Sequence, residues 1–298
     1  MSKTISYLVA FLTGAVIAIM VVFNTEFGKL TSSEVSLIIN QIVGIITLTF
    51  IMLVFKKSPA VNPDKKKARW YNYFGGLFGV FIISFNYLTV TGTNATIAMA
   101  GAVFGQSLMG LIFDITGFMG VKKERPDKKR YISLFISLLG IIMLFISKEH
   151  FNALYLIPAV AAGILTMIQM VYNSHLASLK GAFYSARVNV ISGLFGSLLY
   201  SFIFFSESTA KGFSHLFSTP FYVIVMGGLL ACVVVVNTNI VIPKIPAVFS
   251  ALLLSCGQLI AAVLIDYFLY GIFTLNQLLG ALVILIGIAL GNIRSLKD

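Results

Sequence analysis

The sequence predicts an all-α membrane protein with ten transmembrane helices, arranged as two inverted five-helix repeats with both termini in the cytoplasm. Three observations predict this class: the apolar composition, the distribution of the basic residues and an internal repeat. The 298 residues are 58% hydrophobic and only 10% charged. A soluble domain of this length could not cover its surface with so little charge, so the chain is expected to lie in a bilayer.

A helix that crosses a bilayer needs roughly 20 mostly apolar residues. Ten segments meet this requirement, at about residues 5–24, 35–55, 70–90, 95–119, 131–147, 154–176, 185–205, 220–241, 246–270 and 275–293. The first segment follows Lys3 and continues to Asn24 without a small-residue cleavage site. It is therefore predicted to be an uncleaved helix and not a signal peptide.

The net charge of +11 is unevenly distributed between the two sides of the predicted membrane. Of the 21 basic residues, only Lys29, Lys148 and Lys211 fall in the odd-numbered loops. The others fall in the termini and the even-numbered loops, which is the positive-inside signal for two cytoplasmic termini. Changing the helix count by one would destroy this alternation, so it also supports ten spans. Basic clusters such as residues 65–69 are expected to contact anionic lipid headgroups, and no nucleic acid is expected as a partner.

Polar residues and glycines recur at a fixed offset in the two halves of the chain. At an offset of 149, the pairs are Gly14 and Gly163, Asn24 and Asn173, Asn40 and Asn189, and Gly44 and Gly193. After a slip of three, the pairs are Gly75-Gly76 and Gly227-Gly228, Gln106 and Gln258, and Asp114 and Asp266. The predicted repeats are residues 1–150 and 151–298, with five helices each. Because five is odd, the second repeat enters the membrane from the opposite side, as in many secondary transporters.

Asp114 and Asp266 are the acidic residues that fall inside predicted spans. A carboxylate within a membrane is costly and is by default a functional candidate. Such a group can exchange a proton for a cationic substrate, so both residues are predicted to couple transport to protons. The alternative is that each carboxylate lies close enough to its interface to be hydrated. Inversion places Asp114 toward the cytoplasmic face and Asp266 toward the outer face.

Amide side chains form a second candidate set, because each offers two donors and an acceptor to a polar substrate. The predicted substrate-binding residues are Gln106, Gln258, Gln169, Asn24, Asn173, Asn40 and Asn189. Gln106 and Gln258 fall near the middle of their spans. The alternative for each of the three glutamines is a hydrogen bond between neighbouring helices, and the asparagines suggest a polar-lined cavity through the centre.

No metal or cofactor is expected. Cys232 and Cys256 lie within predicted spans without metal-ligand spacing, which favours a role as small core residues. Small-residue surfaces such as Gly101 with Gly105 are expected to pack helices within one bundle. The chain is accordingly expected to be a monomer or a weak homodimer.

Several short segments resemble the drug/metabolite transporter superfamily, and most closely its YdcZ-like branch. They are Gln169-Met170-Val171-Tyr172-Asn173-Ser174-His175-Leu176, Gly257-Gln258-Leu259-Ile260 and Leu264-Ile265-Asp266-Tyr267, with looser cognates at Phe23-Asn24 and from Gly105-Gln106 through Asp114. Met20 replaces the position of Gln169 in the first half. The resemblance implies a carrier of small organic molecules in the bacterial cytoplasmic membrane, driven by a gradient and not by ATP.

The favoured function is secondary active transport of a small, cationic or amphipathic compound by alternating access, coupled to protons. A channel and a lipid flippase are the alternatives; fast electrogenic flux would indicate the first and transport of labelled lipid the second. An intramembrane aspartyl protease is disfavoured, because two acids that share a proton must approach within hydrogen-bonding reach. Inversion separates Asp114 from Asp266, so the chain is not expected to be an enzyme.

Overall fold

The structure is a computed structural model that describes residues 3–55, 68–118, 123, 128–146, 152–241 and 247–292. Within these ranges the chain is helical and contains no strand, which confirms the predicted all-α class. Most of the longest predicted loop, residues 56–67, lies outside the described residues. The predicted repeat boundary at residues 148–151 also lies outside them.

The first half contains five α-helices in the described ranges. They are α1 (Lys3–Leu30), α2 (Ser33–Val54), α3 (Leu77–Gly92), α4 (Ala95–Thr116) and α5 (Lys128–Ile146), with a 3-10 turn η1 (Trp70–Phe74) before α3. Each corresponds to a predicted span. The predicted end of the first helix at Asn24 is wrong, because α1 continues for six further residues to Leu30. Asn24 is therefore an interior helical residue.

The second half contains five corresponding helices and one addition. The helices are α6 (Leu156–Lys180), α7 (Ala182–Phe204), α9 (Phe221–Val241), α10 (Ala247–Tyr270) and α11 (Leu275–Asn292). The addition is the short helix α8 (Ser206–Ser214), which lies between predicted spans; the 3-10 turns η3 (Ala153–Tyr155) and η4 (Leu216–Ser218) precede α6 and follow α8. α6 ends at Lys180, four residues beyond its predicted end, so Asn173 is also interior.

By length and composition, eight helices in the described ranges could cross a membrane. α5 and α11 are the two predicted spans outside this group; α11 contains a shorter apolar helix at Leu275–Leu290.

Local signals explain where several helices begin and end. Ser32 and Asn94 accept hydrogen bonds from the N–H groups of Val35 and Ile97 and so cap α2 and α4. Gly181 separates α6 from α7 with a φ of 96°, a conformation that favours glycine.

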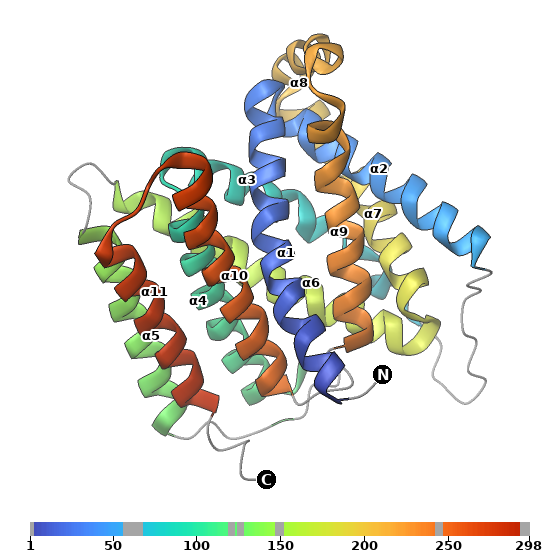
Figure 1. Cartoon of the computed structure of the whole chain (residues 1–298). Coiled ribbons are helices and arrows are strands. Elements are labelled where there is room, and N and C mark those ends of the chain that lie inside the picture. Colours follow the sequence, from blue (N-terminus) through green and yellow to red (C-terminus); the bar gives the residue numbers. More distant parts are fainter. Residues whose placement is uncertain are drawn as a thin grey trace. The chain divides into compact units, whose positions relative to one another are not determined.

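The chain divides into two compact units, each built from segments of both halves. Unit 1 comprises Met1–Ile19, Leu88–Met167 and Val241–Asp298, and unit 2 comprises Met20–Tyr87 and Ile168–Ile240. Figure 1 colours these segments by sequence. The predicted repeats, residues 1–150 and 151–298, describe a duplication of the sequence. The compact units do not test this duplication, so the repeats stay a prediction.

Glycines bring helices of the two halves into backbone contact within unit 1. A methyl group added at Gly14 would collide with the carbonyl oxygen of Leu254, and one added at Gly163 with that of Ala102. These two contacts correspond under the predicted pairing of the halves, since Gly14 pairs with Gly163 and Ala102 with Leu254. Gly257 against Phe11 and Gly105 against Val160 form a second corresponding pair. The α1–α10 crossing therefore has a counterpart in the α4–α6 crossing.

α5 and α11 form a close helix pair in unit 1 and lie side by side in Figure 1. Gly140 packs against the backbone of Gly280 and Ile284, and Gly287 packs against Ser133 and Ser137. Small residues let two helix backbones approach closely, which is how helices associate where lipid surrounds them.

Unit 2 is built around the pairing of α2 with α7. A cluster of buried residues at this pairing contains Leu48, Ala186, Val190 and Cys232. Gly44 and Gly193 belong to the same helix pair, and Gly44 lies against Val190 while Gly193 lies against Gln41. The predicted assignment of Cys232 to the core is confirmed, whereas Cys256 is half-buried.

Candidate functional site

Gln106 and Gln258, both predicted to lie near the middle of their spans, are in contact in unit 1. Each is the twelfth residue of its helix, Gln106 in α4 and Gln258 in α10. The Nε2 of Gln106 donates to the Oε1 of Gln258 at 3.5 Å, which is a long hydrogen bond. Gln258 is fully buried, and its Nε2 has no hydrogen-bond partner. A buried donor without a partner costs free energy, so a polar partner at this position would be favoured.

The two amides meet where α4 packs against α10, and each follows a glycine at another helix crossing. Gln106 follows Gly105, where α4 crosses α6, and Gln258 follows Gly257, where α10 crosses α1. The pair therefore joins two residues that correspond between the halves, from two crossings that also correspond.

Asp266 caps the start of α4 and is almost completely buried. Its Oδ1 accepts a hydrogen bond from the N–H of Ala95 at 3.1 Å, and its Oδ2 accepts one from the N–H of Thr96 at 2.8 Å. The first N–H groups of a helix have no partner within the helix and carry its positive dipole end. The Asp266 carboxylate therefore ties α10 to the first turn of α4.

Asp114 forms an ion pair with Arg130, which lies in the first turn of α5. Both side chains are partly exposed, at 20% for Asp114 and 28% for Arg130. Asp266 is bonded at the start of α4, and Asp114 lies near the end of the same helix. A helix rises about 1.5 Å per residue, so the 19 residues from Ala95 to Asp114 span roughly 28 Å. The structure thus keeps the two acids apart, and they do not form a pair that shares a proton.

The four predicted asparagines form two matching pairs within unit 2. The Nδ2 of Asn40 donates to the Oδ1 of Asn24 at 2.7 Å, and the Nδ2 of Asn173 donates to the Oδ1 of Asn189 at 3.1 Å. All four side chains are buried. Serine hydroxyls repeat the correspondence: Ser36 donates to the Asn24 carbonyl oxygen at 3.0 Å and Ser185 to that of Asn173 at 2.7 Å. These asparagines thus form hydrogen bonds between neighbouring helices, and substrate binding by them stays a prediction.

Gln169 joins the second asparagine pair. Its Nε2 donates to the Oδ1 of Asn189 at 3.1 Å and to the carbonyl oxygen of Gly75 at 3.3 Å. Gln41, which the sequence reading did not single out, is buried nearby and lies close to Gly193. Gln41 falls within a predicted span and is polar, but its counterpart in the second half is Val190, so the repeat that selected Gln106 does not select it.

A buried carboxylate, Glu34, was also missed. The predicted second span began at residue 35, but α2 begins at Ser33, so Glu34 lies in the first turn of the helix and is 4% exposed. It accepts hydrogen bonds from the hydroxyl of Ser33 at 2.7 Å and from the hydroxyl of Ser208 of α8 at 3.1 Å. The prediction that only Asp114 and Asp266 are acidic residues within the long helices is therefore wrong. Glu26 also lies in such a helix, near the end of α1.

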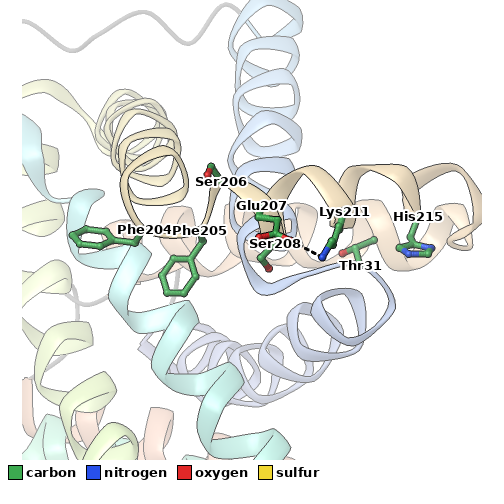
Figure 2. Close-up of a pocket in the computed structure, with 8 residues that line it drawn as sticks. All are labelled: Thr31, Phe204, Phe205, Ser206, Glu207, Ser208, Lys211 and His215. Carbon is green, nitrogen blue, oxygen red and sulfur yellow. Dashed lines mark hydrogen bonds and ion pairs between the residues drawn. The ribbon is translucent and has the colours of Figure 1, made fainter.

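α8 borders a surface pocket of about 660 Å³ in unit 2. Figure 2 shows its lining residues, which are Thr31, Phe204, Phe205, Ser206, Glu207, Ser208, Lys211 and His215. Lys211 and Glu207 form an exposed ion pair at 2.6 Å. None of the predicted site residues lines this pocket.

Among the residues that the structure describes, no three His, Cys, Asp or Glu side chains are grouped as metal ligands would be.

These features define a multi-pass α-helical membrane protein with corresponding polar groups contributed by two halves of one chain. The profile of the family described as "Putative inner membrane exporter, YdcZ" matches the chain twice, over residues 5–143 and 154–290. The chain belongs to this family, and it is a multi-pass transporter of the inner membrane. The predicted YdcZ-like membership is confirmed.

A protein with a solved crystal structure has a similar fold, with a TM-score of 0.66. Its sequence is 15% identical, and the match covers 100% of this chain and 98% of that protein. At this identity the likeness concerns the fold alone. The comparison with curated proteins gives no match.

Proposed function

We propose that the protein is a secondary active transporter that moves a small cationic or amphipathic organic compound across the inner membrane by alternating access. The observation that carries the proposal is the contact between Gln106 and Gln258, two corresponding residues from the two halves. Two repeats of opposite orientation can exchange conformations of similar energy around such a contact. Ten spans and two cytoplasmic termini, as the basic residues predict, give the repeats this inverted orientation.

The amide pair is the proposed centre of substrate binding. Its hydrogen bond is long, and the Nε2 of Gln258 lacks a partner, so a substrate that brings a hydrogen-bond acceptor gains more than it displaces. The closest acids along α4 and α10 are Asp114 and Asp266, each eight residues from the pair and so about 12 Å along the helix axis. Substrate binding and proton uptake are thus assigned to separate groups.

The contacts of the two acids connect proton uptake to helix movement. A proton on Asp266 competes with the hydrogen bonds from Ala95 and Thr96, and a proton on Asp114 competes with the ion pair to Arg130. Protonation therefore releases α10 from the first turn of α4, or α4 from α5. This is the form of coupling that an antiporter needs, because the proton and the conformation then depend on each other.

Gln106→Leu and Gln258→Leu are each expected to abolish saturable flux while the variants still insert and elute as folded protein. A thermal-shift screen of the purified protein against metabolites and organic cations supplies the substrate, since a ligand that binds only the folded state stabilises it. Flux of that compound is then measured in proteoliposomes. Gln277→Leu is the control: Gln277 is another buried glutamine of unit 1, outside the amide pair, and this variant is expected to transport.

Normal flux in both pair variants would remove the amide pair from the site. Electrogenic flux far above carrier rates would indicate a channel, and transport of labelled lipid would indicate a flippase.

A further inference from the structure

Arg187 is a cationic side chain within α7, a helix that is long and apolar enough to cross the membrane. It lies five residues after the start of this helix at Ala182. Its side chain is half-buried, and its Nε is shielded from solvent without a hydrogen-bond partner. Among the residues that the structure describes, no carboxylate pairs with it. A charged group in a membrane span is costly unless it meets a counter-charge, so Arg187 needs an anion from elsewhere.

The acids of unit 2 lie too far away to serve as that anion. Those within the described residues are Glu26, Glu34 and Glu207. Glu26 and Glu34 flank the turn between α1 and α2, and Glu34 is hydrogen-bonded to Ser208 of α8. Glu207 lies in α8 itself. α8 follows the end of α7 at Phe204, 17 residues after Arg187 and so roughly 26 Å along the helix. Salt screens exposed charges over about 8–10 Å, so these acids do not neutralise Arg187.

Two more basic residues lie at the same end of unit 2 as Arg187. Lys180 ends α6, two residues before α7 begins, and it has no partner among the described residues. Arg69 immediately precedes η1, which packs against α7. Side chains of a helix lean toward its N-terminus, so the guanidinium of Arg187 extends back toward this end. Three positive charges therefore gather there, with none of the described acids of the unit.

Trp70, the only tryptophan of the chain, lies at the same level. η1 and α7 run in the same direction, because Gly76, just after η1, lies against Asn189, and Leu77 lies against Gly196. The six residues that lead from Trp70 to Gly76 thus run beside the six that lead from residue 183 to Asn189. This places Trp70 level with the first turn of α7, and its side chain is 76% exposed. Tryptophan is enriched where a membrane meets water, so this level is the expected membrane boundary.

The side of α7 that carries Arg187 is open toward lipid. Ile191 and Leu198 share its helix face, four and eleven residues further on, and they are 47% and 49% exposed. Apolar side chains exposed on a membrane-spanning helix contact lipid, so Arg187 stands at the end of a lipid-contacting row. A headgroup can reach it there without displacing a helix. The counterpart of Arg187 in the first half, at the offset of 149, is Ile38, which is apolar and 4% exposed.

We propose that the phosphate headgroup of an anionic phospholipid binds at this end of unit 2. The site consists of Arg187, Lys180, Arg69 and Trp70. The planar fork of a guanidinium donates two parallel hydrogen bonds to phosphate oxygens, which gives Arg187 the anion that it lacks. Lys180 and Arg69 add positive charge, so a headgroup of net negative charge is preferred to a zwitterionic one. This inference goes beyond the proposed transport function and does not depend on it.

Trp70 makes the site observable, because tryptophan emission of the purified full chain comes from this one residue. The protein in a non-ionic detergent is titrated with phosphatidylglycerol and, in parallel, with phosphatidylcholine of the same acyl chains. The wild type is expected to show a saturable change in emission with phosphatidylglycerol, at an apparent Kd about tenfold or more below that for phosphatidylcholine. Inorganic phosphate is the third arm. It is expected to have no effect at the same concentrations, because it lacks the acyl chains that hold a lipid against α7.

Arg187→Gln is expected to weaken binding of phosphatidylglycerol by about tenfold or more, because glutamine has neither the charge nor the fork of donors. Arg187→Lys keeps the charge without the fork and is expected to bind with an affinity between that variant and the wild type. Lys211→Gln is the matched control. It removes one positive charge from the same unit at the α8 end, and it is expected to bind as the wild type does.

Equal affinity of the wild type for the two lipids would overturn the proposal, and this comparison needs no variant. An Arg187→Gln variant that binds phosphatidylglycerol like the wild type would also overturn it. An equal loss in Lys211→Gln would show that net charge, and not this site, attracts the lipid. An equal response to inorganic phosphate would show that the ligand is a free anion and not a lipid headgroup. Flux does not enter these measurements, so failure of the proposed transport function would leave the site unaffected.

Discussion

Gly14→Ala and Gly163→Ala are each expected to destabilise the protein by about 1–3 kcal/mol, the usual cost of added volume in a packed core, whereas Gly110→Ala is expected to be neutral or stabilising. At the first two positions the added methyl group meets backbone atoms, those of Leu254 and Ala102 respectively. Backbone of a packed helix cannot move aside as a flexible side chain can, so the helices must separate. At Gly110 the nearest atom is the methyl carbon of Met167, at an ordinary contact distance of 3.8 Å. Alanine there gains helix propensity of up to about 1 kcal/mol.

The measurement is the unfolding midpoint of the three purified variants in one detergent, compared with the wild type. The first two midpoints are expected to fall by similar amounts, because the two contacts correspond between the halves. A midpoint for Gly14→Ala or Gly163→Ala as high as that of Gly110→Ala would contradict the described helix crossings.

Asp114→Asn and Asp266→Asn are each expected to abolish flux driven by a proton gradient, with a loss of roughly 100-fold or more, while insertion into the membrane is retained. An asparagine cannot take up and release the proton, although it keeps the size of the side chain and one acceptor oxygen. Asp266→Asn can therefore still accept a bond from the first turn of α4. This makes loss of coupling distinguishable from loss of fold.

Flux in proteoliposomes is measured with and without an imposed proton gradient, at equal amounts of inserted protein. Glu207→Gln is the control, because Glu207 is an exposed carboxylate of α8, 82% accessible and paired with Lys211. It is expected to transport like the wild type. If both aspartate variants transport normally under the gradient, proton coupling through these residues is wrong.

Helix class and approximate position could be predicted from the sequence, because long apolar segments in a bilayer leave the backbone few options besides helix. The sequence paired Gln106 with Gln258 near the middle of their spans, but their contact could not be predicted, because it depends on which faces of α4 and α10 meet. The ends of the helices were harder to predict from the sequence. α1 continues past Asn24 to Leu30, and hydropathy does not report the hydrogen bond to Asn40 that accompanies the burial of this polar side chain.

Partners contributed by distant segments could not be predicted. Arg130 was counted only as part of a basic cluster, and nothing in its own sequence context assigns it to Asp114. The burial of Glu34 was not predicted. Its carboxylate is bonded to Ser208, which is 174 residues away and lies in the unpredicted helix α8. Met20 stands where the second half has Gln169, but the sequence does not report that Asn40 donates to Asn24 while Asn189 accepts from Asn173.

The glycine crossings of unit 1 also bear on how such a chain could have arisen. Gly14 has its partner at Leu254 and Gly163 has its partner at Ala102, so neither half buries its own glycine against itself. A shorter ancestor with one copy of the five helices would need a second molecule to complete these two crossings. That molecule would have to be inserted in the opposite orientation, as the predicted inverted repeat implies. Fusion of two such molecules into one chain would make these helix contacts intramolecular. Each copy could then change independently of the other. The methionine at position 20 is the kind of change that only a fused chain can keep on one side.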